Sequence, residues 1–129
     1  MKGTTALRIL VIEDHAGIAD ALRLLLEEEA YQVEIWANAS MVRHLQAPLP
    51  DLILLDLLLG GMDGRMLCHQ FKSEPSTCSI PIVMMSANKH IADIATQAGA
   101  DGFLLKPFEP EAVFALIGAC VGRAASDDC

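Results

Sequence analysis

The sequence lacks an apolar run long enough to cross a membrane, although hydrophobic residues make up 53% of it. The apolar stretch from Leu52 to Leu59 is interrupted by Asp56, and no apolar run approaches the length of about 20 residues that a membrane-spanning helix needs. The N-terminal segment also shows no signal peptide with a small-residue cleavage site. We therefore expect a cytoplasmic protein that has no membrane partner.

Basic residues and paired cysteine motifs are scarce as well. Nine lysines and arginines stand against 17 aspartates and glutamates, so the formal net charge is −8. Binding to nucleic-acid phosphates requires a basic surface, so we expect this domain itself to bind no nucleic acid. The four cysteines form no C-x-x-C pair, which argues against a zinc site, and we expect them to be reduced thiols.

The 129-residue chain does contain apolar, strand-like runs that alternate with amphipathic helical stretches. Five strands alternating with five helices predict an α/β fold with a doubly wound parallel sheet covered on both faces. Residues 1–122 are expected to form this domain, with 123–129 a polar tail or the start of a linker. The predicted strands cover 7–12, 32–36, 52–56, 80–85 and 102–105. The predicted helices cover 18–26, 38–47 (capped by Asn38), 63–71 (capped by Asp63), 91–98 (ended by Gly99) and 110–122.

Polar residues follow four of the predicted strands at the point where each strand ends: Glu13 and Asp14, Asp56, Ser86, and Lys106. Each one alone could be a helix cap, a turn residue or a solvated charge. Because the carboxyl ends of parallel strands lie at one edge of the sheet, these side chains are expected to converge there. Their coincidence favours a functional site over separate structural roles.

Three carboxylates in one crevice repel one another unless a cation compensates them. An all-oxygen set of ligands suits Mg2+ rather than zinc, and we interpret His15 as the residue that precedes a helix, not as a ligand. A carboxylate beside Mg2+, a lysine and a hydroxyl has the parts for phosphoryl transfer to aspartate. Asp56 would be the nucleophile, Lys106 would neutralise charge, and Ser86 would donate a hydrogen bond to the phosphoryl group.

The ordered motifs Glu13-Asp14, DLLLGGMDG (56–64), Ser86-Ala87 and AGADGFLLKPF (98–108) resemble the receiver domain of two-component response regulators over essentially the whole chain. The resemblance implies a flavodoxin-like sheet with strand order 2-1-3-4-5 and Asp56 as the phosphoacceptor. It implies that Asp14, Asp56 and the Leu58 carbonyl ligate Mg2+, with Glu13 acting mainly through a metal-bound water. Ser86 and Lys106 would bind the phosphoryl group.

The resemblance also implies partners and a switch. A sensor histidine kinase or a phosphotransfer protein would donate the phosphoryl group, in a self-catalysed reaction followed by autodephosphorylation. The output surface would comprise residues 89–98, Phe103 and residues 109–121, and would contact a downstream effector or form a phosphorylation-dependent homodimer. Phe103 occupies the position of the switch aromatic; the alternative is an ordinary core residue of its strand.

Two positions depart from the family pattern. Phe103 lacks the hydroxyl that a tyrosine would offer, so switching would rest on packing alone. The pattern also usually has proline four residues after the phosphoacceptor. This chain has Gly60 there, followed by Gly61, and the pair is expected to make the loop more flexible.

Two other functions associated with such a sheet fit the sequence poorly. A flavodoxin-type flavin protein needs a phosphate-binding loop after the first strand, where Glu13 and Asp14 would repel the phosphate. A haloacid-dehalogenase-like phosphatase needs a D-x-D-x-T/V motif there, which is absent. Two alternatives stay open: a pseudo-receiver that binds partners without phosphorylation, and a receiver fragment of a larger, DNA-binding regulator.

Overall fold

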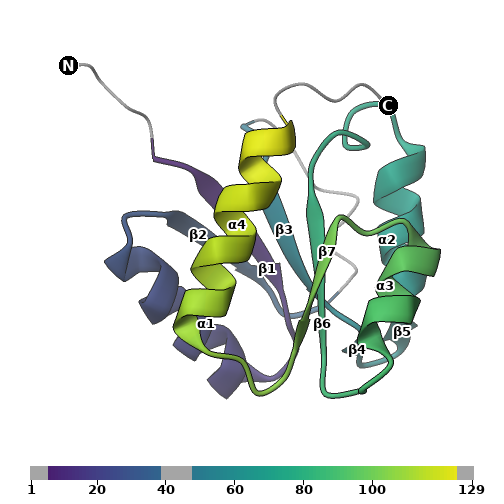
Figure 1. Cartoon of the computed structure of the whole chain (residues 1–129), viewed down its shortest axis with the longest axis horizontal. Coiled ribbons are helices and arrows are strands. Elements are labelled where there is room, and N and C mark those ends of the chain that lie inside the picture. Colours follow the sequence, from purple (N-terminus) through teal and green to yellow (C-terminus); the bar gives the residue numbers. More distant parts are fainter. Residues whose placement is uncertain (1–5, 39–47, 125–129) are drawn as a thin grey trace.

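A computed structural model of the chain describes residues 6–38 and 48–124. Its centre is a five-stranded parallel sheet with helices on both faces (Figure 1). The strand order is β2-β1-β3-β6-β7, which is the predicted 2-1-3-4-5 order. The labels shift because a separate antiparallel hairpin, β4 (Leu58–Leu59) and β5 (Met62–Asp63), follows β3. The sheet strands are β1 (Arg8–Ile12), β2 (Gln32–Trp36), β3 (Leu52–Asp56), β6 (Ile82–Ser86) and β7 (Gly102–Leu105).

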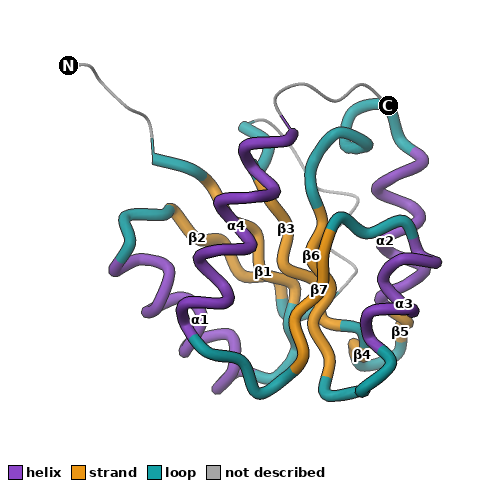
Figure 2. Tube along the Cα trace, viewed as in Figure 1, coloured by secondary structure: helices purple, strands orange, loops and turns teal. Residues whose placement is uncertain are grey.

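Four helices lie in the described residues, two on each face of the sheet (Figure 2). Helices α1 (Ala16–Glu28) and α4 (Pro110–Ala124) pack on one face, and α2 (Gly64–Ser73) and α3 (Ile91–Ala98) pack on the other. The helix predicted for 38–47 falls on residues 39–47, which lie outside the described residues. None of the four has the length and apolar character that crossing a membrane would require.

Local sequence signals predict two of three helix ends correctly. Asp63 caps α2 as predicted, since its Oδ1 accepts a hydrogen bond from the Arg65 N–H at 2.8 Å. Gly99 ends α3 in the left-handed conformation at φ 83°. In contrast, α4 continues to Ala124, two residues past its predicted end at Gly122. A glycine inside a helix costs only about 1 kcal/mol, and the arginine and alanine that follow favour helix.

Strand β3 holds the middle of the sheet and carries the candidate phosphoacceptor at its end. Leu52 and Leu54 belong to the apolar cluster under α1 and α4, whereas Ile53 and Leu55 belong to the cluster under α2 and α3. This alternation is the two-residue period of a strand buried on both faces. Each such side chain contributes about 1.5–3 kcal/mol on burial, so Asp56 ends a rigid element.

The cysteines follow the prediction only in part. Cys68 and Cys120 are buried free thiols, and burial raises the pKa of Cys68 to about 11, which keeps it protonated at neutral pH. Cys78 is disulfide-bonded, so the prediction of reduced thiols is wrong for this residue. It lies half-buried in the turn after α2, whereas Cys68 and Cys120 are buried. Cys129 lies outside the described residues.

Candidate functional site

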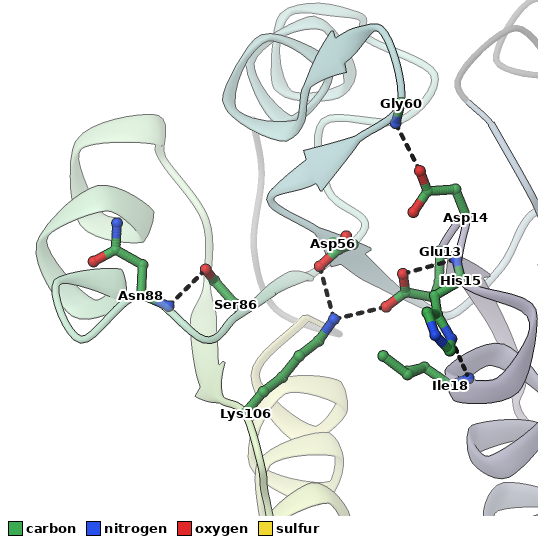
Figure 3. Close-up of polar contacts among 9 residues, drawn as sticks. All are labelled: Glu13, Asp14, His15, Ile18, Asp56, Gly60, Ser86, Asn88 and Lys106. Atoms are coloured by element: carbon green, nitrogen blue, oxygen red, sulfur yellow. Dashed lines mark hydrogen bonds and ion pairs between the residues drawn. The ribbon is translucent and has the colours of Figure 1, made fainter.

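The polar residues that follow the strands meet at one edge of the sheet (Figure 3). Glu13 and Asp14 follow β1, Asp56 is the last residue of β3, Ser86 is the last residue of β6, and Lys106 follows β7. The strand register aligns these ends, because Asp56 is opposite Met85 and Ser86 is opposite Leu105. The cluster therefore lies at the carboxyl edge of the sheet, where open α/β sheets bind their ligands.

Lys106 joins two of the carboxylates. Its Nζ donates hydrogen bonds to Glu13 Oε1 at 2.8 Å and to Asp56 Oδ1 at 2.9 Å. The Lys106 side chain is 18% exposed, whereas those of Glu13 and Asp56 are 1% and 9% exposed. The Lys106 backbone N–H donates to the Ser86 carbonyl at 2.8 Å. One residue thus connects the ends of β1, β3, β6 and β7, which the sequence did not indicate.

Burial and charge both perturb the pKa values in this cluster. Burial raises the pKa of Asp56, and the negative charges of Glu13 and Asp14 raise it further, whereas the hydrogen bond and charge of Lys106 oppose the rise. Burial alone would lower the pKa of Lys106, but its hydrogen bonds to Glu13 and Asp56 outweigh this effect and raise that pKa. With all four groups ionised, three carboxylates and one ammonium leave two negative charges uncompensated.

The donor atoms of this cluster fit a hard divalent cation. Glu13, Asp14 and Asp56 each offer one carboxylate oxygen, and these oxygens lie within 4.8 Å of one another. Asp14 is exposed, so the cluster is open to solvent on its side. Oxygen ligands with access to water are what Mg2+ prefers, and two uncompensated negative charges match its charge. Both oxygens of Glu13 are engaged, one by Lys106 and one by the His15 N–H at 3.2 Å.

His15 directly precedes α1, as the sequence predicted, and its side chain caps that helix. Its Nδ1 accepts a hydrogen bond from the Ile18 N–H at 3.2 Å. The helix therefore begins two residues after Asp14, at Ala16, and fixes the backbone next to it.

The loop after Asp56 contains a short β-hairpin, and the flexibility expected from its two glycines stays a prediction. Leu59 and Met62 pair across the β4–β5 hairpin, and Gly60 and Gly61 form the turn between them. Gly61 has φ +80°, a conformation that favours glycine. The Gly60 N–H donates to Asp14 Oδ2 at 2.7 Å. The sequence marked Gly60 as unusual but did not predict this contact.

Gly64 is a second position that the sequence analysis missed. A Cβ atom there would lie 2.4 Å from the Asp56 carbonyl oxygen. The Gly64 N–H also donates to the Leu57 carbonyl at 2.7 Å. The first residue of α2 thus packs directly on the backbone of the candidate phosphoacceptor, which only glycine allows. The sequence signal was the glycine that follows the helix cap.

The remaining predicted residues lie at the margin of the cluster. Ser86 is 5% exposed and its Oγ accepts a hydrogen bond from the Asn88 N–H at 3.0 Å. The Leu58 side chain is 73% exposed, and the role of its carbonyl stays a prediction. Phe103 is 45% exposed, so its interpretation as an ordinary core residue is wrong. On the edge strand β7 only Leu104 faces the core, because alternate side chains point to opposite faces.

Comparison with known proteins gives consistent matches. The sequence profile of the response regulator receiver domain matches residues 9–118. The phosphate regulon transcriptional regulatory protein PhoB of Escherichia coli (strain K12) is 40% identical over 121 residues, which cover 92% of this chain and 53% of PhoB. The chain spans about half the length of the curated relatives it matches.

Two solved structures show the same fold. The signal receiver domain of a signal transduction histidine kinase from Syntrophus aciditrophicus is 30% identical, with a TM-score of 0.84 and coverage of 95% of this chain and 96% of that one. The receiver domain of sensor histidine kinase PA1611 from Pseudomonas aeruginosa is 24% identical, with a TM-score of 0.82 and coverage of 92% and 99%. The PA1611 structure has a magnesium ion coordinated in its active-site cleft.

Proposed function

This chain belongs to the response regulator receiver domain family, and we propose that it accepts a phosphoryl group on Asp56 in a Mg2+-dependent reaction. The observation that carries this assignment is the position of the Asp56 carboxylate. It ends a buried strand, accepts a hydrogen bond from the Lys106 ammonium at 2.9 Å, and lies with Glu13 and Asp14 in one carboxylate cluster. The donor is a sensor histidine kinase or a phosphotransfer protein, in the cytoplasm.

The proposed step transfers a phosphoryl group from an imidazole nitrogen of the donor to a carboxylate oxygen of Asp56. A carboxylate oxygen of Asp56 attacks the phosphorus of a phosphoimidazole; an O–P bond forms, the N–P bond breaks, and the imidazole nitrogen keeps the electron pair. Lys106 is already hydrogen-bonded to Asp56, so its charge is positioned to stabilise the transferring group. The Ser86 oxygen accepts from Asn88, which leaves its hydroxyl proton to donate to a phosphoryl oxygen.

The carboxylate cluster is the proposed Mg2+ site. Asp14 and Asp56 would hold the ion directly, together with the Leu58 carbonyl. Glu13 would act through a water, because both of its oxygens already accept hydrogen bonds. When bound, Mg2+ supplies positive charge that offsets the charge on the phosphoryl oxygens.

The output surface is proposed on α3, β7 and α4. Phe103 and Leu105 on the edge strand β7 are each 45% exposed, an amount of apolar surface that favours contact with a protein partner. This partner is a downstream effector or a second copy of the domain. Because PhoB is named a transcriptional regulatory protein and is about twice as long, we propose transcriptional control as the output to test first.

The phosphoacceptor assignment is tested with a small phosphodonor. Wild-type protein is incubated with acetyl phosphate, with and without Mg2+, and the product is followed by intact-mass spectrometry and hydroxylamine cleavage. We expect one hydroxylamine-sensitive phosphoryl group that requires Mg2+, and none on Asp56→Asn. Asp20→Asn, on the exposed face of α1, serves as the matched control. Undiminished label on Asp56→Asn would overturn the assignment, and no label on the folded wild type would favour the pseudo-receiver.

A further inference from the structure

The Asp14 carboxylate accepts a hydrogen bond from a backbone amide. The Gly60 N–H donates to Asp14 Oδ2 at 2.7 Å, across 46 positions of the chain (Figure 3). Gly60 lies in the turn of the β4–β5 hairpin, which follows Asp56 directly. One short loop therefore links the proposed phosphoacceptor to a second carboxylate of the same cluster.

This bond depends on the residue type at position 60. Proline, the residue usual here in the family pattern, has no backbone N–H and could not donate it. Gly60 does not have the positive φ that Gly61 has, so backbone conformation alone does not require glycine at this position. Its Cβ would lie 3.2 Å from the same Asp14 oxygen, so a side chain would crowd the carboxylate. The close approach of the Gly60 backbone to Asp14 is therefore the reason that glycine suits position 60 better than a residue with a side chain.

The bond acts on a carboxylate that is otherwise mobile. Asp14 is exposed, and an exposed side chain samples several rotamers unless a partner holds one of them. The amide engages Oδ2 and leaves Oδ1 to bind a cation. It also brings a positive dipole to a cluster with excess negative charge. Hydrogen-bonding partners of this kind orient metal-ligating carboxylates, and their loss costs about 10- to 100-fold in metal affinity.

We propose that the Gly60 amide is a positioning group for the Mg2+ site, holding Asp14 in its ligating orientation before the ion binds. The proposal rests on the proposed function, in which Asp14 is a direct ligand. It assigns to this chain a backbone contribution to metal affinity that a proline at position 60 would lack.

The first test compares Mg2+ affinity among variants at position 60. Isothermal titration and amide NMR titration give the dissociation constant without any phosphodonor. We expect Gly60→Pro to remain folded without Mg2+ and to bind Mg2+ about tenfold more weakly than wild type. Gly60→Ala keeps the N–H and is expected to lose less. Gly118→Ala, with no atom near its Cβ, controls for glycine replacement as such. Equal affinity of Gly60→Pro and wild type overturns the proposal.

The second test observes the hydrogen bond itself. In the metal-free protein, Asp14→Ala should move the Gly60 amide proton upfield and speed its exchange with solvent, whereas Asp20→Ala should change neither. The amide should stay protected when Mg2+ binds to the wild type. Unchanged exchange in Asp14→Ala, or loss of protection on Mg2+ binding, overturns the proposal, because the bond would then be absent or displaced by the ion.

A further variant keeps the proposal testable if Gly60→Pro does not fold. Replacing the amide at position 60 by an ester exchanges the donating N–H for an oxygen without introducing a proline ring, and the same tenfold loss is expected. Failure of the proposal is distinguishable from failure of the proposed function. If wild type binds Mg2+ and the ester variant binds it equally well, only the positioning role is wrong. If wild type itself binds no Mg2+, the metal site of the proposed function is wrong.

Discussion

The Lys106 ammonium at the end of β7 lies 2.9 Å from Asp56 Oδ1 at the end of β3, 50 positions away in the chain. The contact is shielded, since the two side chains are 18% and 9% exposed. The Lys106 charge does not fully offset the cost of ionising Asp56 in this site, because burial and the neighbouring acids still raise the pKa of Asp56. The site without a cation is therefore electrostatically unfavourable to the folded state.

Asp56→Asn is expected to stabilise the Mg2+-free protein at neutral pH. The folded pKa of Asp56 lies above its ordinary value of 3.8, so between the two values the folded state binds more protons than the unfolded state. Stability from this group therefore falls as pH rises through that window. Urea unfolding at several pH values should show the variant more stable than wild type at pH 7, with the difference shrinking in acid. A variant less stable than wild type at pH 7 contradicts this prediction.

Mg2+ should stabilise the wild type but not Asp14→Ala to the same extent. A ligand that binds only the folded state adds about 2.7 kcal/mol at a concentration 100 times its dissociation constant. Asp14→Ala removes a proposed ligand, so its thermal shift should be much smaller, whereas Asp20→Ala should shift like the wild type. Thermal melts with and without Mg2+ measure this. Equal shifts in wild type and Asp14→Ala would rule out Asp14 as a ligand.

Gly64→Ala and Gly118→Ala should have opposite effects on stability. The new Cβ at position 64 would lie 2.4 Å from the Asp56 carbonyl oxygen, and overpacking of this kind costs about 1–3 kcal/mol. Position 118 is exposed within α4 with nothing near its Cβ, so alanine should add about 0.5–1 kcal/mol through helix propensity. Urea unfolding compares the two. A neutral Gly64→Ala would mean that α2 shifts freely relative to Asp56.

Lys72 should matter more to stability than Arg65, although each forms one ion pair. Lys72 Nζ donates to Asp101 Oδ2 at 2.7 Å and to the Ile80 carbonyl at 2.9 Å, and is largely buried. Lys72→Met should cost about 1.5–3 kcal/mol, as expected for hydrogen bonds to a charged group. Arg65 pairs with Asp63 in solvent and lowers the pKa of that carboxyl, so Arg65→Met should cost little, and nothing in high salt. Equal losses would contradict the difference in burial.

Much of the fold could be predicted because its signals are local. Four of the five sheet strands begin and end within one residue of their predicted limits. In β1, β3 and β7 the signal is a short, mainly apolar run ended by a polar residue, and in β2 it is the alternation of polar and apolar residues. The strand predicted for 80–85 begins at Ile82 instead, because Pro81 lacks the N–H for a ladder bond. In α1, Ala19 is buried and Ala21 is exposed, a difference that the predicted helix over 18–26 does not specify. Two neighbouring alanines differ too little in hydrophobicity to fix the rotation of the helix.

The contacts inside the site could not be predicted in the same way. The strand ends indicated that Glu13, Asp14, Asp56 and Lys106 would meet, because topology alone aligns them. Which atoms pair depends on three-dimensional distances that no local pattern encodes, as with Gly60 and Asp14. The β4–β5 hairpin was missed for another reason. Strands of two residues are too short to show a period.

Phosphorylation should alter the output surface through Lys106. The Lys106 N–H bonds the Ser86 carbonyl at 2.8 Å, so a phosphoryl group that draws in Lys106 and Ser86 would move the ends of β7 and β6 together. Phe103, on the same edge strand, is exposed and has room to change rotamer. A bias of about 5.5 kcal/mol takes such a two-state equilibrium from 1:99 to 99:1.

Amide NMR with beryllofluoride, which mimics the acyl phosphate, tests this coupling. In the wild type we expect shifts near Asp14, Asp56 and Ser86 and also across residues 89–121. Lys106→Ala should retain the local shifts, because Asp56 and the other carboxylates remain, but should lose most of the shifts at 89–121. Lys89→Ala, an exposed lysine outside the carboxylate cluster, should respond like the wild type apart from its immediate neighbours. If the wild-type shifts stay confined to the loops around the three site residues, the surface formed by α3, β7 and α4 is not the output, and the ammonium serves the transfer step alone.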